Sequence, residues 1–461
     1  MTDTYQRVSL VGLGKLGLCL AGCLAERGFD TLGVDVEERV LKTVNQGRAP
    51  WFEPGLDELL ARNVGGRLRT TTEHADAIED TDVTIILVAT PSNTDGTFSN
   101  RFIEAALRSL AEAFGRSRKA HHSFIISSTV MPGSTEESFI PTIEKYSRRK
   151  LHQDFSVCYD PDFVALGNAI RGFLEPDVVV IGQSDPAAGA RMEALHRHLC
   201  ENQPKISRMS IISAEMAKVC LNAFITLKIT FANSIANMCE KIPGADVDAI
   251  STAIGADRRI SPHYFRGGLG FGGTCFPRDT HAYVALAKKV GAQAQLIEAT
   301  RSVNDLQQSH FAETVLRELN RVNNKTVGVL GLAFTAKTPV LVESPATKLI
   351  QELLRHDVRV TAFDFLALDN ARAQFGSALE YADSPERCLA QCGLAVVALR
   401  DEVLSQAVER FHPDEPLTVI DAWRIIDPAI LDDRIHYVPL GRFTADGARL
   451  ANALSVAALA G

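Results

Sequence analysis

The 461-residue sequence predicts an α/β protein with two doubly wound parallel-sheet domains, joined by a long central helix and a small all-α domain. Three observations support this fold class. Short apolar runs alternate with helical stretches early in the chain, and parallel strands need such crossovers. Residues 214–240 hold neither Gly nor Pro and are mostly apolar, which predicts one buried helix of roughly 40 Å at ~1.5 Å per residue. The opening pattern of strand, glycine turn, helix, strand and aspartate recurs from about residue 324.

The first domain is predicted over residues 1–205. Its first strand, Arg7–Val11, runs into Gly12-Leu13-Gly14-Lys15-Leu16-Gly17, and a helix follows to about Arg27. The three glycines allow a tight turn, the approach of a pyrophosphate, and close packing of helix on strand. Asp35 ends the next strand, where its carboxylate can accept from ribose hydroxyls and repels a 2′-phosphate. This Rossmann-like pattern predicts bound NAD, and a structural turn with a solvated Asp35 is the alternative. Further strands are expected at Val83–Ala89, Phe124–Ser128, Phe155–Tyr159 and Val178–Ile181.

Two more domains are predicted after the first. The central one, residues 206–320, contains the long helix and a glycine-dense stretch at Gly267–Gly273. The third, residues 321–461, is a second Rossmann-like domain. It opens with the strand Lys325–Leu332, continues with a helix at about 346–355, and has a strand that ends at Asp364. Its glycine turn is longer than that of the first domain and lacks the third glycine of the pattern.

The composition excludes several classes of function. Lys plus Arg total 48 against 56 Asp plus Glu, and no basic cluster stands out, so no nucleic-acid partner is expected. The nine cysteines form no CxxC pair and no zinc-ligand spacing, which predicts free thiols in a reducing cytoplasm and no metal. The uninterrupted apolar runs are far shorter than the ~20 residues of a membrane span, so no membrane association is expected.

The glycine-dense stretch leads into a candidate nucleophile. The segment Gly270–Asp279 contains Cys275, and Asp279 lies one turn further on if a helix begins at the cysteine. A thiol can add to an aldehyde to give a thiohemiacetal, which can be oxidised to a thioester. On these residues alone, a small buried hydrophobic cysteine is the more common alternative.

Two other groups of residues suggest chemistry. Lys218 and Asn222 are four apart on the long helix and share one of its faces, and a buried Lys needs a partner unless it extends to solvent. Asp160-Pro161-Asp162-Phe163 follows the strand Phe155–Tyr159, at the end where parallel sheets place ligand sites. A plain Asp-Pro turn is the alternative for the second group.

Together these motifs resemble the UDP-glucose/GDP-mannose dehydrogenase family, in the family's order and over almost the whole chain. The resemblance extends to Asn45–Pro50 with Glu53–Leu56, Thr90-Pro91, Ser128–Val130, Glu175–Gly182, Ala214-Glu215, Gly244–Val247 and Asp257 with Arg259-Ile260. The family oxidises the C6 alcohol of a nucleotide sugar to a carboxylate and reduces two NAD. The resemblance therefore implies a nucleotide-sugar 6-dehydrogenase that converts UDP-glucose to UDP-glucuronate for polysaccharide biosynthesis. It also implies a homodimer formed through the long helix.

The resemblance assigns roles to individual residues. Cys275 captures the aldehyde, while Lys218 and Asp279 assist removal of the alcohol proton and stabilise the oxyanion. Asp162 acts as a base or positions the hydrolytic water, Asn222 holds the sugar or the oxyanion, and Thr129 orders water near the nicotinamide. Arg259 reaches the sugar nucleotide of the partner subunit. The expected cofactor-binding residues are Gly12, Leu13, Gly14, Lys15, Leu16, Gly17, Asp35, Thr90 and Thr129. The expected substrate-binding residues are Asp162, Phe163, Val164, Lys218, Asn222, Arg259, Tyr264, Phe265, Arg266, Gly272 and Phe276.

The sequence departs from the family pattern at several positions. The Asn-Pro-Glu-Phe motif reads Asp160-Pro161-Asp162-Phe163, which shortens the second carboxylate by one methylene, and a second Glu is replaced by Leu166. In the third domain, charged family residues are replaced by Thr335, Val340 and Val342, and the family's Asp-Gly-Arg motif contains Trp423 instead. In the central domain, the lysine that follows Phe-Pro is replaced by Arg278. These changes favour an altered substrate or slower thioester hydrolysis.

Three alternatives to this reading are open. The substrate can be another nucleotide sugar, such as a UDP-N-acetylhexosamine or GDP-mannose. The protein can perform a single oxidation, as β-hydroxyacid dehydrogenases do, although that chemistry needs no cysteine. A regulatory paralogue that only binds nucleotide sugars is the third alternative, and the retained Lys218, Asn222, Cys275 and Asp279 argue against it.

Overall fold

The computed structural model describes residues 5–443 of the chain. The chain divides into two units. The first consists of Met1–Leu221 and His281–Ala292, and the second of Asn222–Thr280 and Gln293–Gly461. Two helices, α9 (Ile211–Cys239) and α11 (Phe276–Lys289), therefore begin in one unit and end in the other.

The first unit contains one eight-stranded sheet in the order β3-β2-β1-β4-β5-β6-β7-β8. Its strands are β1 (Arg7–Val11), β2 (Asp30–Val34), β3 (Leu68–Thr71), β4 (Val83–Ile86), β5 (His122–Ile126), β6 (Phe155–Tyr159), β7 (Val178–Gln183) and β8 (Lys205–Ser210). All neighbours are parallel except β6 and β7, which pair antiparallel through Cys158↔Gln183 and Tyr159↔Gly182. The predicted parallel sheet is confirmed, with this one antiparallel pair. The sequence patterns missed β3 and β8, because neither strand is an apolar run.

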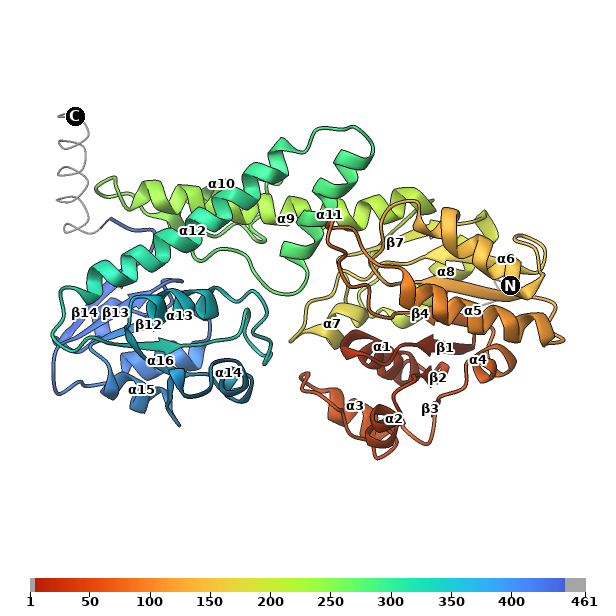
Figure 1. The fold of residues 1–461 in the computed structure, drawn as a ribbon, viewed down its shortest axis with the longest axis horizontal. Coiled ribbons are helices and arrows are strands. Elements are labelled where there is room, and N and C mark those ends of the chain that lie inside the picture. The colour runs from red at the N-terminus through yellow and green to blue at the C-terminus, as the bar shows by residue number, and fades with distance from the viewer. Residues whose placement is uncertain (1–4, 444–461) are drawn as a thin grey trace. The chain divides into compact units, whose positions relative to one another are not determined.

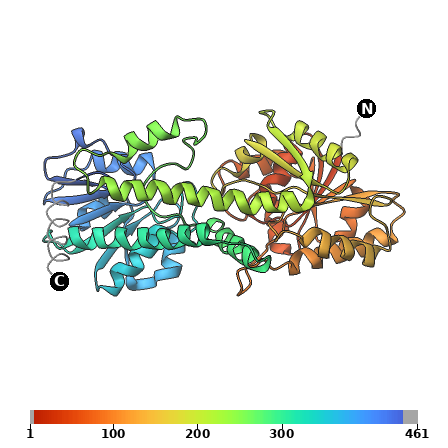
Figure 2. The same ribbon diagram turned by 90° about the horizontal axis from the view of Figure 1, so that it is seen from above.

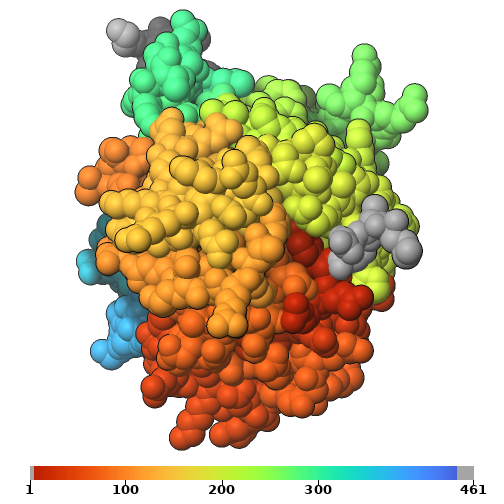
Figure 3. Space-filling view, turned by 90° about the vertical axis from the view of Figure 1, so that its right-hand side faces the viewer, coloured from red at the N-terminus to blue at the C-terminus, as the bar shows by residue number. Residues whose placement is uncertain are grey.

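Helices cover both faces of this sheet, and a hydrophobic core lies under each layer. The helices are α1 (Lys15–Glu26), α2 (Glu38–Val44), α3 (Leu56–Asn63), α4 (His74–Asp80), α5 (Arg101–Arg116), α6 (Ile140–Ser147), α7 (Ala169–Leu174) and α8 (Pro186–Leu199), with a π-helical turn at Thr135–Phe139. Buried residues of α1, α3 and α8 share one core, whereas those of α4 and α5 share the other with the start of α9. Figure 3 shows the orange and yellow segments, which include α5 and α6, as a continuous surface of this unit.

The second unit contains a six-stranded sheet, in the order β11-β10-β9-β12-β13-β14, in which all neighbours are parallel. Its strands are β9 (Thr326–Leu330), β10 (Arg359–Phe363), β11 (Glu380–Tyr381), β12 (Leu394–Val397), β13 (Leu417–Asp421) and β14 (Ile435–Pro439). Its helices are α10 (Val247–Gly255), α12 (Gln295–Leu319), α13 (Pro345–Arg355), α14 (Leu368–Phe375), α15 (Pro385–Gln391) and α16 (Glu402–Glu409), with short 3-10 turns at Gly376–Ala378 and Pro428–Ile430. Helices α12 and α13 share a core with one face of the sheet, and α15 and α16 with the other (Figure 1). This strand order, with helices on both faces, is that of a Rossmann-type doubly wound sheet.

The predicted internal repeat is visible in backbone geometry. Gly12 follows β1 with a φ of +96°, and its N–H donates to Val34 at 2.8 Å. Gly331 follows β9 with a φ of +88°, and its N–H donates to Phe363, also at 2.8 Å. Both strands therefore leave their sheets through the same left-handed glycine turn.

The long helix α9 extends over Ile211–Cys239, close to the predicted range. Within the second unit it lies beside α12 (Figure 2), where Asn237 donates to Gln307 at 2.7 Å. Of the described helices, α9 alone is long and apolar enough to cross a membrane. Half of its apolar 18-residue stretch is buried inside the protein. Since core helices of soluble proteins share these properties, this is weak evidence for a membrane span. In a single chain, Phe224, Phe231 and Met238 of α9 are more than half exposed. The expected burial of this helix between domains or between subunits therefore stays a prediction for this face.

Candidate active site

The glycine turn after β1 is shaped to receive a phosphate group. A Cβ on Gly12 would lie 2.5 Å from the Leu87 carbonyl oxygen, and one on Gly17 would collide with the Gly12 carbonyl. A Cβ on Gly14, by contrast, would meet no atom within 4 Å. Gly14 also precedes the first residue of α1, where unpaired N–H groups and the helix dipole favour an anion. The turn therefore leaves room where the pyrophosphate of NAD is expected, and the residues present fit that cofactor.

Asp35 holds this turn together. Its carboxylate accepts from the Leu13 N–H at 2.7 Å and from the Glu37 N–H at 3.0 Å. The side chain is only half-buried, and a carboxylate has about four acceptor positions, so capacity for ribose hydroxyls is left. The structure thus adds a supporting role for Asp35 to the cofactor-binding role that was predicted.

The corresponding residue of the second sheet, Asp364, has a different environment. It is buried and accepts from four backbone N–H groups, those of Leu332, Ala333, Leu366 and Ala367. These four bonds match the acceptor capacity of a carboxylate. The repeat therefore keeps the supporting role of the aspartate, while only the first sheet keeps an aspartate that can bind a ribose.

Thr90 and Thr129 lie in buried segments that follow β4 and β5, the strands next to β1 on one side of the sheet. Ser128 joins these segments, because its hydroxyl accepts from the Val88 N–H at 2.9 Å and donates to the Val88 carbonyl at 2.8 Å. Both threonines therefore lie at the same edge of the sheet as the glycine turn, as expected for cofactor contacts.

Lys218 is paired with Asp162 inside the first unit. Its ammonium donates to the Asp162 backbone carbonyl and lies 3.8 Å from the Asp162 carboxylate. Only 8% of the Lys218 side chain and 11% of the Asp162 side chain are exposed. The ammonium also lies 5.1 Å from the centre of the Phe163 ring, a cation–π contact. The buried Lys thus has the partner that its position on α9 required, and Val164 continues this segment with its N–H facing Asp162 at 3.4 Å.

Two buried glutamates, to which no role was assigned from the sequence, anchor the segments around this pair. Glu215, one turn before Lys218 on α9, accepts from the N–H groups of Gly133 and Thr135 at 2.6 and 3.0 Å, and burial raises its pKa. Glu53 accepts from the N–H groups of Gly167 and Ala169 at 2.9 and 2.8 Å. In the sequence, only a weak signal marks these anchors: Glu215 interrupts an apolar stretch, and Glu53 precedes Pro54-Gly55.

Cys275 immediately precedes α11 in the second unit. It is exposed, Cys220 is half-buried, and the other seven of the nine cysteines are buried. The contrast is chemical as well as steric, because burial raises the pKa of Cys158 and of Cys388 to about 12. Thr274 lies beside the Cys275 sulfur, with its hydroxyl at 3.5 Å. The role of this exposed thiol as a nucleophile stays a prediction.

Asp279 lies one turn after Cys275, as predicted, with its N–H donating to the Cys275 carbonyl at 2.8 Å. Its side chain is fully buried and accepts from Asn222 at 2.5 Å and from Arg278 at 2.9 Å. Asn222 and Lys218 share one face of α9, one turn apart. The structure therefore joins the predicted residues into two groups, Lys218 with Asp162 in one unit, and Asn222 with Asp279 in the other.

Amide side chains from two helices clamp the backbone of the glycine-dense loop. Asn233 of α9 accepts from the Gly268 N–H at 2.8 Å and donates to the Leu269 carbonyl at 3.1 Å. Asn304 of α12 does the same to both polar groups of the Phe271 backbone, at 2.7 and 3.2 Å. Gly272 approaches the Glu343 backbone so closely that a Cβ would collide with it. No local sequence pattern marks these partners, because each lies more than thirty residues from the loop.

The other predicted substrate residues have varied environments. Tyr264 is half-exposed, and its ring contacts Phe276 edge-on with centroids 6.1 Å apart. Arg266 is exposed, whereas Phe265 is buried and stacks on Phe231 of α9. Arg259 is 86% exposed and forms an ion pair with Asp257, two residues away, at 2.6 Å. The Phe265 ring therefore contributes to packing, whereas the side chains of Tyr264, Arg266 and Arg259 are exposed and Phe276 is half-buried.

The altered third-domain motif has a structural use. Trp423 donates to the Ala398 carbonyl at 3.0 Å, and its ring lies against Gly268. The Arg424 side chain is fully buried and directs its donors to Asp248 and to the carbonyls of Gly267, Ala422 and Leu440. Since a guanidinium has five N–H groups and these contacts use five, Arg424 has none left for a phosphate.

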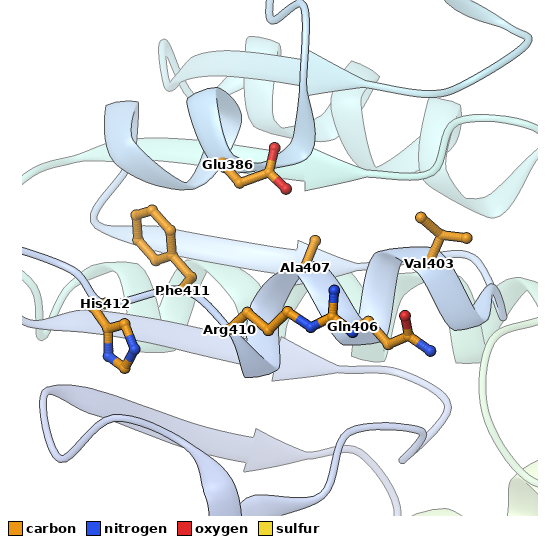
Figure 4. A pocket seen from close by; sticks show the side chains of 7 residues that line it. All are labelled: Glu386, Val403, Gln406, Ala407, Arg410, Phe411 and His412. Atoms are coloured by element: carbon orange, nitrogen blue, oxygen red, sulfur yellow. The ribbon is translucent and has the colours of Figure 1, made fainter.

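A shallow hollow between α15 and α16 is separate from these residues (Figure 4). It has a volume of about 180 Å³, and none of the predicted site residues lines it. Its lining consists of Glu386, Val403, Gln406, Ala407, Arg410, Phe411 and His412.

Comparison with known proteins identifies the family. Models of three domains of the UDP-glucose/GDP-mannose dehydrogenase family match the chain: the NAD-binding domain at residues 6–200, the central domain at 212–306 and the UDP-binding domain at 328–428. These matches bear on the family; the domain boundaries drawn from the sequence stay predictions.

Individual relatives agree with the domain matches. The chain is 36% identical over 421 residues to a UDP-glucose 6-dehydrogenase of Haloferax volcanii, covering 91% of this chain and 97% of the relative. It is 34% identical to a GDP-mannose 6-dehydrogenase of Pseudomonas putida, covering 78% of this chain and 80% of that protein. The structure resembles a UDP-glucose dehydrogenase of Pyrobaculum islandicum with a TM-score of 0.86 and 29% identity, over 96% of this chain and 98% of the other. With the glycine turn and the exposed cysteine in place, the chain belongs to the UDP-glucose/GDP-mannose dehydrogenase family of NAD-dependent nucleotide-sugar 6-dehydrogenases.

Proposed function

We propose that the protein oxidises UDP-glucose to UDP-glucuronate in two steps at C6. The observation that carries this proposal is the exposed Cys275 directly before α11, one turn from the buried Asp279 that accepts from Asn222. NAD, when bound, accepts one hydride in each oxidation. A thiol is needed only if the aldehyde must be held between two oxidations, so this arrangement favours the double oxidation over a single one.

In the first step, the C6 alcohol loses a hydride and its hydroxyl proton, and becomes an aldehyde. Lys218 and Asp279 are the residues that assist proton removal, and the Lys218 ammonium has donors beyond the one used by the Asp162 carbonyl. A fixed cation stabilises the negative charge that develops on the alcohol oxygen during the reaction.

Cys275 then forms a C–S bond to the aldehyde carbon, which gives a thiohemiacetal. Loss of the second hydride and of a proton converts this adduct to a thioester. Water attacks the thioester carbonyl, the C–S bond breaks, and the carboxylate leaves while the thiol is restored. Asp162 is proposed to position or activate this water, because its carboxylate lies 3.8 Å from the Lys218 ammonium in a largely buried pair.

Two observations bear on the choice of nucleotide sugar. The relative that is named a UDP-glucose 6-dehydrogenase aligns over 97% of its length, and the UDP-glucose dehydrogenase structure superposes with a TM-score of 0.86. A GDP-mannose dehydrogenase structure of Pseudomonas aeruginosa is 30% identical with a TM-score of 0.53. These comparisons favour UDP-glucose, with GDP-mannose and UDP-N-acetylhexosamines as the alternatives.

We also propose a homodimer formed through α9. Phe224, Phe231 and Met238 expose 58%, 56% and 54% of their surface and repeat every seven residues along the helix. Lys228, on the same helix, donates to the carbonyls of Ile260 and Ser261 at 3.0 and 3.2 Å, which fixes the loop of the exposed Arg259 beside it. A second copy on this face would cover the apolar stripe and place Arg259 within reach of the partner's substrate.

Initial rates over a panel of nucleotide sugars test the proposed substrate. Purified protein and NAD are combined with UDP-glucose, UDP-N-acetylglucosamine, UDP-N-acetylmannosamine or GDP-mannose, and NADH formation is followed. The proposal expects the highest kcat/KM for UDP-glucose and a carboxylate product. A higher kcat/KM for another sugar would replace UDP-glucose, and no NADH with any sugar would favour a regulatory role.

A further inference from the structure

A buried ion pair outside the predicted set lies beside Asp162. His196 of α8 and Asp160 meet through the imidazole Nε2, at 2.9 Å from one carboxylate oxygen and 3.0 Å from the other. The two side chains are 13% and 12% exposed. Both partners belong to the first unit, and they join α8 to the carboxyl end of β6.

The position of Asp160 gives this pair its significance. Its N–H continues the ladder from β6 by donating to the Ile126 carbonyl at 2.9 Å, and the next regular element is α7, which begins at Ala169. The irregular segment between them carries Asp162, two residues after Asp160. Glu53 holds the far end of this segment through Gly167 and Ala169. The ion pair with His196 holds the near end.

The ion pair accounts for two departures from the family pattern, at Asp160 and Asp162. The family motif has Asn where this chain has Asp160, and an amide would leave a buried imidazolium without a counter-charge. Asp162 is one methylene shorter than the family's Glu, so its carboxylate depends more on where the backbone lies. A fixed backbone at Asp160 offsets the shorter side chain.

We infer that the Asp160–His196 ion pair is a positioning device that sets the backbone of residues 160–164, and through it the Asp162 carboxylate, against Lys218. The expected effect on turnover rests on the proposed function, whereas the effect on the backbone does not. Asp160 and His196 are positioning residues, because within the described part of the first unit neither forms a hydrogen bond or ion pair with Lys218.

The His196 imidazole carries its proton at neutral pH. Burial alone would lower the pKa of His196, but the Asp160 carboxylate outweighs burial and raises it to about 10. The groups that act on the ring are Asp160 from the end of β6 and Cys200 from the C-terminal end of α8. The attraction between the two charges is therefore maintained over the range in which the enzyme would be assayed.

Three variants test the inference: Asp160→Asn, His196→Gln, and the double variant that carries both. Each single change leaves one largely buried charged group facing a neutral amide, without its counter-charge, whereas the double variant pairs two neutral amides. We expect kcat to fall on the order of 10- to 100-fold in each single variant, with the dissociation constant of NAD unchanged within about two-fold. The double variant is expected to recover a large part of the lost kcat. As a control, Asp432→Asn disrupts another His–Asp pair, the one with His412, whose side chain is 75% exposed, and should leave kcat unchanged.

A second readout does not depend on catalysis. Hydrogen exchange of the amides of residues 162–166 should be faster in both single variants than in the native protein, and slower again in the double variant. Native protein that is inactive with every nucleotide sugar would reject the proposed function, yet this exchange pattern would still support the positioning device. The inference would be overturned if hydrogen exchange and kcat stayed at native values in both single variants. It would also be overturned if the loss of kcat in the double variant equalled the combined losses of the two single variants.

Discussion

Replacement of the buried Arg424 by Met is the stability change whose size the structure defines best. The guanidinium bonds twice to Asp248, at 2.7 and 3.0 Å, and donates to the carbonyls of Gly267, Leu440 and Ala422 at 2.6, 2.7 and 3.1 Å. Methionine keeps much of the volume but none of the donors. The variant therefore leaves one carboxylate and three carbonyls without this partner.

The expected loss follows from the burial of these groups. Removing one member of a buried ion pair costs about 3–5 kcal/mol, since the other charge remains desolvated. Asp248 is 30% exposed and keeps Arg442 at 3.2 Å, which favours the lower end of that range, whereas the three carbonyls add to the loss. We therefore expect Arg424→Met to lower the free energy of unfolding by about 3–5 kcal/mol.

Denaturant unfolding at pH 7 measures this loss, with Arg442→Met as a matched control. Arg442 bonds to the same Asp248 but is 35% exposed, so its replacement should cost only about 0–1 kcal/mol. Burial of Asp248 raises its pKa, but the hydrogen bond and charge of Arg424 outweigh burial and lower the pKa below its usual value. The stability that this ion pair contributes is therefore present at neutral pH and is lost as the pH falls through the lowered pKa. The difference between native protein and Arg424→Met should accordingly shrink in acid. Equal losses for the two variants at pH 7 would refute the structural role assigned to Arg424.

Four further predictions concern catalysis, cofactor binding, pH and assembly. Cys275→Ser should stop after the first hydride transfer, so normal steady-state turnover of this variant would reject the nucleophile. Asp35→Ala should weaken NAD binding by about 1.5–3 kcal/mol in a fluorescence titration, whereas Asp364→Ala should lower stability and leave NAD affinity unchanged. Because the pKa of His196 is raised from 6.5 to about 10, its contribution to stability is complete below pH ~6.5 and is lost toward pH ~10; urea midpoints should show this decline in native protein but not in His196→Gln. Phe231→Ser should shift a dimer toward monomer in sedimentation, and an unchanged dimer would exclude α9 as its interface.

The parts of the fold that were predicted correctly depend on local signals. The glycine turn and Asp35 were found because the turn, the helix start and the strand end each require particular residues within a short segment. Helix α9 was found because it contains no Gly or Pro. The strands β3 and β8 were missed, since Leu68–Thr71 and Lys205–Ser210 contain no run of apolar residues.

The candidate site was predicted less completely, because many of its contacts join distant residues. The nucleophile and Asp279 are neighbours in sequence, and their relation was predicted from helix geometry. Asn304 and His196, by contrast, act on segments that are 33 and 36 residues away, and nothing around them in sequence marks those partners. Trp423 was recognised as part of an altered motif, but the complete burial of the adjacent Arg424 depends on Asp248 and on three backbone carbonyls.

The number of NADH molecules formed per sugar tests the double oxidation at Cys275 most directly. A limiting amount of UDP-glucose is consumed to completion with excess NAD, and NADH is measured by absorbance alongside the sugar product. Retention of the aldehyde on the thiol predicts two NADH for each sugar and a carboxylate as the product. One NADH for each sugar, with free aldehyde in solution, would show that the thiol does not hold the intermediate.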